Sequence, residues 1–290
     1  DTRKVLYTDS DRLLFGQVLS ELEQYEGVIE ATAQVNPASH LGGRVSLLRA
    51  RAALFLGRPK LLEETLTQIE ANKVELDTDR AREVLDLMIG GGLEAPALRL
   101  ATHLVTSEHS VSGRNLNLAA VTSAIIGNSA DSREWVELAN AFLTDNTPTL
   151  GLLLLNLQEG DLDAIAPLAR ELRDAEPAWA QPAHPALLAA LEGRLGEARA
   201  LTLTGLEGAP HDPIWPLLGA SLNSLGAAPI ADGVLGAGLG KGAREPLGII
   251  SSLPPVGGLE LTAMLLALDA PEWSTWTDSR LGHAVYRNLL

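Results

Sequence analysis

Apolar residues recur along most of the chain at the three- and four-residue intervals that mark one face of an α-helix. Near the C-terminal end, residues 215–225 predict one helix, residues 230–239 predict a second, and Gly226 lies between them. The same order of helix, glycine and helix recurs upstream at a nearly constant step. The glycines of this series are Gly57, Gly92, Gly127, Gly160, Gly193 and Gly226. This regular spacing predicts stacked helical hairpins, and therefore an all-α solenoid of seven to eight hairpins.

The ends of the chain depart from the period. Gly27, which begins the second helix of the first predicted pair, lies less than one period before Gly57, so this pair is predicted to cap the stack. After residue 243, Pro254 and Pro255 interrupt the pattern, and the predicted helices at 259–268 and 278–290 close the other end. The predicted organisation is an N-terminal arm and capping helix pair at 1–39, repeats at 40–242, and C-terminal capping helices at 243–290. The other predicted helices span 11–24, 27–35, 44–56, 59–73, 80–89, 94–105, 114–126, 132–143, 149–158, 162–175, 185–191 and 195–206.

Composition agrees with close-packed helices, since 46% of residues are hydrophobic but only 4% are aromatic. The formal net charge of −15 disfavours nucleic acid and anionic lipid as partners, and the chain has no cysteine. The longest apolar run, residues 150–157, is far short of the roughly 20 residues of a spanning helix, so no membrane insertion by this segment is expected. Cytoplasmic and extracytoplasmic locations both remain open, as does the oligomeric state.

The repeat around Gly226 resembles the tetratricopeptide repeat family. Trp215, Leu218, Gly219 and Ala231 occupy signature positions, with Leu222 in place of Tyr and Leu235 in place of Phe. Other repeats match at fewer positions, and the resemblance covers about residues 40–240. It implies a right-handed superhelix whose first helices line a concave groove, and a protein that binds other proteins without catalysis.

Residues 13, 10, 6 and 3 before each turn glycine lie on one helical stripe, which we expect to line the groove. The stripe is polar and basic near the N-terminus and apolar toward the C-terminus. A planar guanidinium binds both oxygens of a carboxylate, so the basic part could hold a peptide C-terminus or an acidic side chain. The candidate partner-binding residues are Arg44, Arg51, Arg82, Arg114 and Asn117 for the carboxylate, and Leu150, Leu154, Leu157 and Leu187 for apolar side chains. The alternatives are arginines that are solvated or paired with Asp79 and Asp86, and leucines hidden by tight packing.

The sequence offers no evident catalytic or metal site. Its six histidines are scattered, no nucleophile–base–orienter set stands out, and no cofactor is expected. We therefore expect a non-catalytic scaffold for a protein or peptide partner. Because the chain begins at Asp1 without methionine, the alternative is a regulatory or anchoring domain trimmed from a larger, possibly membrane-attached, enzyme. A helical-repeat hydrolase or transferase would need titratable groups that converge in a pocket.

Trp273 and Trp276 lie three residues apart and would share one side of a helix or turn. We expect them to cap the open end of the solenoid, with a partner-binding patch as the alternative.

Overall fold

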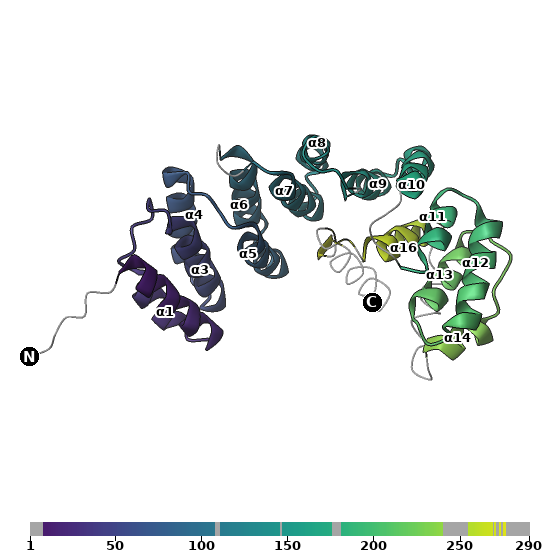
Figure 1. Ribbon diagram of the computed structural model, residues 1–290, viewed down its shortest axis with the longest axis horizontal. Helices are drawn as coiled ribbons and strands as arrows, with labels where there is room; N and C mark the ends of the chain where they lie inside the picture. Colours follow the sequence, from purple (N-terminus) through teal and green to yellow (C-terminus); the bar gives the residue numbers. More distant parts are fainter. Residues whose placement is uncertain are drawn as a thin grey trace, which may run out of the picture. The chain divides into compact units, whose positions relative to one another are not determined.

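The computed structural model describes residues 8–107, 111–145, 147–175, 181–239, 255–268, 270, 273, 275 and 276. In these residues every regular element is a helix, which confirms the all-α prediction (Figure 1). The chain divides into two compact units, residues 1–128 (unit 1) and 129–290 (unit 2), and each is described by itself. The predicted helix at 278–290 lies outside the described residues.

Unit 1 contains seven helices within its described residues, and their bounds lie close to the predicted ones. They are α1 (Asp9–Glu21), α2 (Tyr25–Thr32), α3 (Gly42–Phe55), α4 (Pro59–Asn72), α5 (Thr78–Gly90), α6 (Glu94–Thr106) and α7 (Gly113–Ile126). Unit 2 contains α8 (Ser129–Ala139), α9 (Thr147–Glu159), the short 3₁₀ helix η1 (Leu162–Ala164), α10 (Ile165–Asp174), α11 (His184–Leu191), α12 (Leu195–Gly208), α13 (Ile214–Ser224), α14 (Asp232–Leu239) and α16 (Pro255–Ala267).

The predicted glycine series is confirmed as a series of identical turns. All six glycines have φ between +61° and +89°, a region that disfavours residues with a Cβ atom. In each turn the next residue donates its backbone N–H to the carbonyl five residues back, at 2.8–3.0 Å, as Arg58 does to Ala53. This pairing satisfies carbonyls that the helix end would leave without a partner. The chain is thus a helical-repeat protein.

The first hairpin has the same turn, but without a glycine. Glu23 adopts φ +58°, and Gln24 donates to the Leu19 carbonyl at 2.8 Å. Glu23 lies one full period before Gly57, whereas Gly27 lies inside α2. The second helix begins at Tyr25 and not at the predicted Gly27, and the glycine series does not predict the turn at Glu23, because a search for glycines cannot detect another residue held in the left-handed region.

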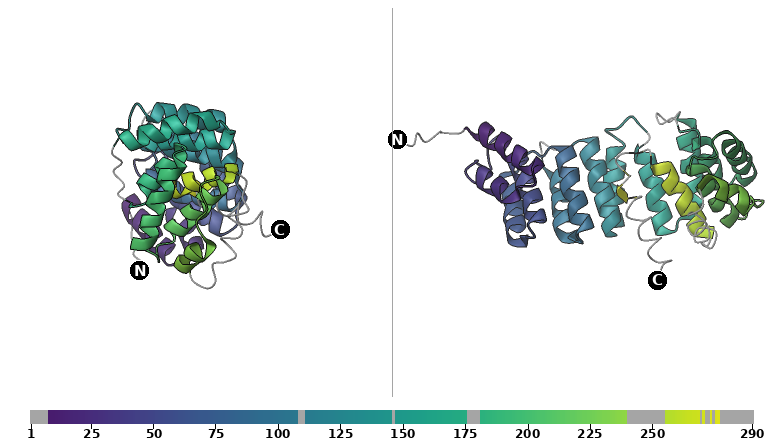
Figure 2. Two further views of the ribbon diagram at one scale, coloured as in Figure 1. Left: turned by 90° about the vertical axis from the view of Figure 1, so that its right-hand side faces the viewer. Right: turned by 90° about the horizontal axis from the view of Figure 1, so that it is seen from below.

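In unit 1 the first helices of successive hairpins contact one another, α1 with α3, α3 with α5, and α5 with α7, while α4 contacts α6. We call the surface formed by α1, α3 and α5 the first-helix face of unit 1 (Figure 2). Apolar side chains between the hairpins form the core. In the first two hairpins this core consists of Leu13, Leu19, Val28, Val35, Val45, Leu48 and Ala52.

Unit 2 repeats the hairpin and then adds a helix that returns onto its own first helices. α9, α11 and α13 are the first helices, and α16 contacts all three (Figure 1). Gly258 permits the approach, because a Cβ atom there would lie 2.4 Å from Ser224 Oγ. Ser221 Oγ bonds both the Gly258 carbonyl, at 2.5 Å, and Thr262 Oγ1, at 2.6 Å. These buried hydrogen bonds set the register of α16 on α13.

Trp273 and Trp276 are 0% and 1% exposed. A Cβ atom at Gly151 would lie 2.5 Å from Trp273, and Trp276 Nε1 donates to Gln158 Oε1 at 3.4 Å. Both tryptophans therefore pack on α9, the first helix of the fifth hairpin, rather than on the last hairpin, where a cap of the open end would lie. Their burial leaves no exposed tryptophan patch at this position. Among the helices that the structure describes, none combines the length and the apolar character needed to cross a membrane.

Candidate functional site

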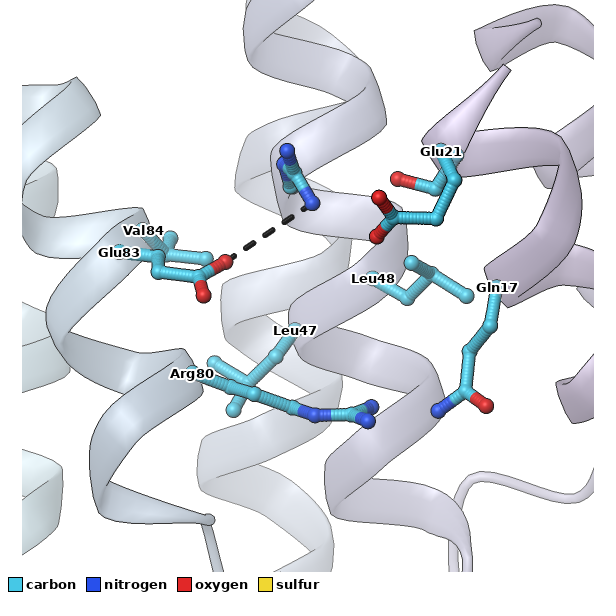
Figure 3. A pocket seen from close by; sticks show the side chains of 9 residues that line it. Gln17, Glu21, Leu47, Leu48, Arg80, Glu83 and Val84 are labelled. Carbon is cyan, nitrogen blue, oxygen red and sulfur yellow. Dashed lines mark ion pairs between the residues drawn. The ribbon is translucent and has the colours of Figure 1, made fainter. Parts of the chain in front are cut away.

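A cavity of about 270 Å³ opens on the first-helix face of unit 1 (Figure 3). Three consecutive first helices, α1, α3 and α5, line it. Its lining residues are Gln17, Ser20 and Glu21 from α1, Leu47, Leu48 and Arg51 from α3, and Arg80, Glu83 and Val84 from α5. The cavity thus combines two guanidinium groups, two carboxylates and an apolar floor.

Arg51 projects from α3 and is held loosely. Its Nη1 lies 3.8 Å from Glu83 Oε2, a distance too long for a hydrogen bond. The guanidinium carbon also lies 5.8 Å from the centre of the Phe55 ring, which in turn stacks on Tyr25 at 4.5 Å. With side chains 29% and 59% exposed, the ion pair contributes no more than about 1 kcal/mol. Arg51 therefore keeps N–H groups that a stronger acceptor can bind.

Arg80 reaches across the cavity from the first turn of α5. Figure 3 shows its guanidinium and the amide of Gln17 pointing toward each other. With the amide turned over from the orientation drawn, Gln17 Oε1 accepts from Nη1 at 2.8 Å and from Nη2 at 2.7 Å. The neighbouring Ser20 hydroxyl is buried and has no hydrogen-bond partner among the described residues.

Only one of the four predicted arginines lines this cavity, namely Arg51. Arg44 is exposed and lines a separate cavity of about 380 Å³ with His40, Glu75 and Asp77. Gly43 permits the start of α3 to approach the backbone of Glu75 closely, because a Cβ atom there would lie 1.9 Å from the Glu75 carbonyl oxygen.

The remaining polar candidates lie farther along unit 1. Arg82 is half-buried and has an interaction partner, and Arg114 on α7 is exposed. Asn117 is fully buried, and neither atom of its amide has a hydrogen-bond partner among the described residues. Arg44, Arg82, Arg114 and Asn117 stay predictions as partner contacts.

Arg80 is the functional candidate that sequence reasoning missed. The predicted stripe on α5 passes through Asp79, Arg82 and Asp86, and Arg80 lies beside it. The cavity is the valley between adjacent helices, so it is lined by residues at the edge of the stripe as well as on it. A search one position to either side of the stripe would have found Arg80.

The four leucines of the predicted apolar groove are buried inside unit 2. Leu150, Leu154 and Leu187 are 0% exposed, and Leu157 is 6% exposed. They lie on α9 and α11, two of the helices that α16 contacts. The alternative of tight packing accounts for their burial, and no apolar stripe of these leucines is open to a partner.

On the opposite side of unit 1, Arg99 of α6 is already satisfied. Its Nε and Nη2 donate to both carboxylate oxygens of Glu70, at 2.9 and 2.7 Å, and Nη1 donates to Glu63. These hydrogen bonds raise the pKa of Arg99 and lower the pKa of Glu70 below its ordinary value of 4.5. A cavity of about 580 Å³ adjoins this cluster. All three guanidinium nitrogens of Arg99 already donate to Glu70 or Glu63. The cavity of α1, α3 and α5 is therefore the better candidate for an anionic ligand.

The described residues bring together no group of three or more His, Asp or Glu side chains that could hold a metal ion. No protein-family model matches the chain, and no curated protein matches it. A solved structure of pilF from Pseudomonas aeruginosa aligns with a TM-score of 0.43 and 12% sequence identity, over 70% of this chain and 93% of the other. The proposed function therefore rests on the side chains of this chain.

Proposed function

We propose that the chain is a non-catalytic peptide-binding scaffold and that the first-helix face of unit 1 holds a partner segment bearing a carboxylate. The main support for this proposal is that Arg51 and Arg80, from two different helices, line the same cavity. A carboxylate from an acidic side chain or a peptide C-terminus suits the planar fork of a guanidinium. The buried side chains of Leu47 and Leu48 form the floor of the cavity.

The competing groups already present are weak enough to be displaced. Glu83 holds Arg51 only through a long contact, and Gln17, which faces Arg80, is an uncharged amide. A partner carboxylate would add the attraction of a full negative charge, which the Gln17 amide cannot supply, to the hydrogen bonds of the guanidinium. Glu21 and Glu83 also border the cavity, so a partner with a basic or polar group next to its carboxylate would match the site better than a purely acidic one.

The first-helix face of unit 2 is a poorer candidate because its own chain covers it. Leu261, Met264, Leu265 and Leu266 of α16 are each at most 5% exposed. At about 1.5–3 kcal/mol for each buried side chain, these four alone contribute roughly 6–12 kcal/mol to keeping α16 in place. A partner would have to offset that free energy before reaching α9, α11 or α13.

Selection of short random peptides on the intact protein, followed by titration of synthetic peptides, tests the proposal. We expect selected peptides to be enriched in Asp, Glu or a required free C-terminus. Arg51→Gln and Arg80→Gln should each weaken binding at least tenfold, which corresponds to about 1.4 kcal/mol. Because the chain carries a net charge of −15, nonspecific attraction cannot produce this preference for acidic peptides.

Arg170→Gln supplies the matched control. Arg170 is exposed on α10 of unit 2, and its replacement removes the same charge far along the sequence from the cavity. Affinity should be unchanged in this variant. If Arg51→Gln and Arg80→Gln bind the selected peptides as tightly as Arg170→Gln does, the carboxylate site does not exist.

A further inference from the structure

The outer face of α1 is apolar and exposed although α1 belongs to a packed stack of helices. Leu14, Phe15, Val18 and Leu22 are 63%, 57%, 48% and 61% exposed. Three of them follow one another at four-residue intervals and therefore form a stripe along the helix. Elsewhere in the described residues, large exposed apolar side chains occur singly or in pairs on any one helix. A contiguous stripe of this kind marks an interaction surface.

The repeat shows which surface this is. Leu14, Val18 and Leu22 lie one period of the stack before Leu48, Ala52 and Leu56. In α3 these positions face the preceding hairpin, since Leu48 and Ala52 are buried in the core they share with α1 and α2. A Cβ atom at Gly16 of α1 would lie 3.1 Å from Leu48 Cδ2, which places Leu48 directly against α1. The exposed stripe of α1 is thus the surface on which a preceding first helix would stack.

The charges around the stripe indicate the kind of helix that fits. Asp11 lies one turn before Leu14, and Glu21 and Glu23 lie on either side of Leu22; all three are exposed. Between residues 8 and 32 the chain has six carboxylates and one basic side chain, that of Arg12. Two such surfaces placed against each other would repel, which disfavours a second copy of this chain as the occupant.

We propose that the stripe Leu14–Val18–Leu22, with Phe15, binds one amphipathic helix with an apolar face and lysines or arginines along its edges. The helix takes the place that a preceding first helix would have, so it continues the α1–α3–α5 stack. Apolar contact with the stripe supplies the affinity, and basic edges facing Asp11, Glu21 and Glu23 supply the orientation. The four apolar residues of this surface do not line the cavity between α1, α3 and α5, which shares only Glu21 with it, so either proposal can fail without the other.

A displayed library of helices of about 18 residues tests the inference on the intact chain. The apolar face is fixed as leucine and alanine, and each edge position is either lysine or glutamate. We expect the helices retained by the wild-type protein to carry a clear excess of lysine at the edges. Synthetic peptides made from them should bind Val18→Glu at least tenfold more weakly. That substitution adds negative charge, so an association driven by charge alone would become stronger instead.

Val234→Glu is the matched control, because Val234 is an exposed valine on α14 whose side chain is 46% exposed, against 48% for Val18. Binding should be unchanged in this variant and lost again in Leu14→Glu, which tests the stripe at a more exposed position. Helices that bind Val18→Glu and wild type equally, or edges without an excess of lysine, would overturn the proposal. A wild-type dimer in sedimentation that Val18→Glu dissociates would also overturn it, by assigning the stripe to a second copy.

Discussion

Units 1 and 2 are built from the same helical hairpin, yet the first-helix face is exposed in unit 1 and covered in unit 2. In unit 1 the face carries charged side chains around an open cavity, where Arg51 makes only a long ion contact and Arg80 bonds an uncharged amide. In unit 2 the corresponding helices carry leucines and small residues, and α16 of the same chain covers them. The repeat thus determines how the helices are arranged. The side chains of the first helices determine whether their face stays exposed to a partner or is covered by the chain itself.

Truncating a leucine of α16 should produce the largest difference between the units. Leu266→Ala, at a position 0% exposed, should lower the free energy of unfolding of unit 2 by about 2–5 kcal/mol. Leu14→Ala, at a position 63% exposed in unit 1, should change stability by less than about 0.5 kcal/mol. All five tryptophans lie between residues 129 and 290, so in a urea titration tryptophan fluorescence reports unit 2, and far-ultraviolet circular dichroism is needed to follow unit 1 as well. A loss in Leu266→Ala as small as that expected for Leu14→Ala would show that α16 is not part of the core.

The close approach of α16 to α13 can be tested at Gly258. Gly258→Ala should cost about 1–3 kcal/mol, because its Cβ atom would overlap Ser224 Oγ. Gly233→Ala in α14 is the control, since no atom lies within 4 Å of the added Cβ atom. That substitution should stabilise unit 2 by about 0.5–1 kcal/mol, the ordinary advantage of alanine over glycine in a helix. A stabilising Gly258→Ala would contradict the packing described for α16.

The turns of unit 1 should respond in opposite directions to opposite substitutions. Gly57→Ala forces a Cβ atom into a φ of +61° and should cost about 1 kcal/mol. Glu23→Gly relieves the same strain at φ +58° and should gain about 1 kcal/mol. Thermal unfolding followed by far-ultraviolet circular dichroism measures both. A loss of stability in Glu23→Gly would mean that the first hairpin does not share the turn of the others.

The smallest expected effect is the pH dependence of the ion cluster on the opposite side of unit 1. The hydrogen bonds from Arg99 lower the pKa of Glu70, so this carboxylate stabilises the fold above its unfolded pKa. That contribution is lost as the pH falls from about 5 through the lowered pKa of Glu70. Glu70→Gln should therefore show a smaller loss of stability over this acidic interval, measured by urea titration at a series of pH values. An unchanged acid dependence of stability would show that Glu70 does not contribute to the loss of stability at low pH.

The hairpins could be predicted from the sequence because each turn glycine and each helical apolar stripe is a local signal. The turn at Glu23 could not be predicted from the sequence. A non-glycine residue adopts the left-handed backbone conformation only when the packing of both helices around it requires this. The docking of α16 could not be predicted either. A helix that is apolar on all sides must be buried, but its sequence does not say against which helices.

The candidate site was predictable only in part, for a related reason. Arg51 lies on the predicted stripe, whereas Arg80 lies at its edge and lines the same cavity as Arg51 only because α5 packs against α3. The leucine stripe was correctly located on first helices, yet whether it is exposed depends on α16, a segment that lies far along the chain from α9 and α11.

We propose that the open first-helix face of unit 1, and not the filled face of unit 2, receives the partner. Hydrogen–deuterium exchange with and without a selected carboxylate-bearing peptide distinguishes the two faces. We expect slower exchange in α1, α3 and α5, with α9, α11, α13 and α16 unchanged. Protection of α9, α11 and α13 together with faster exchange in α16 would show instead that the peptide displaces α16 and binds unit 2.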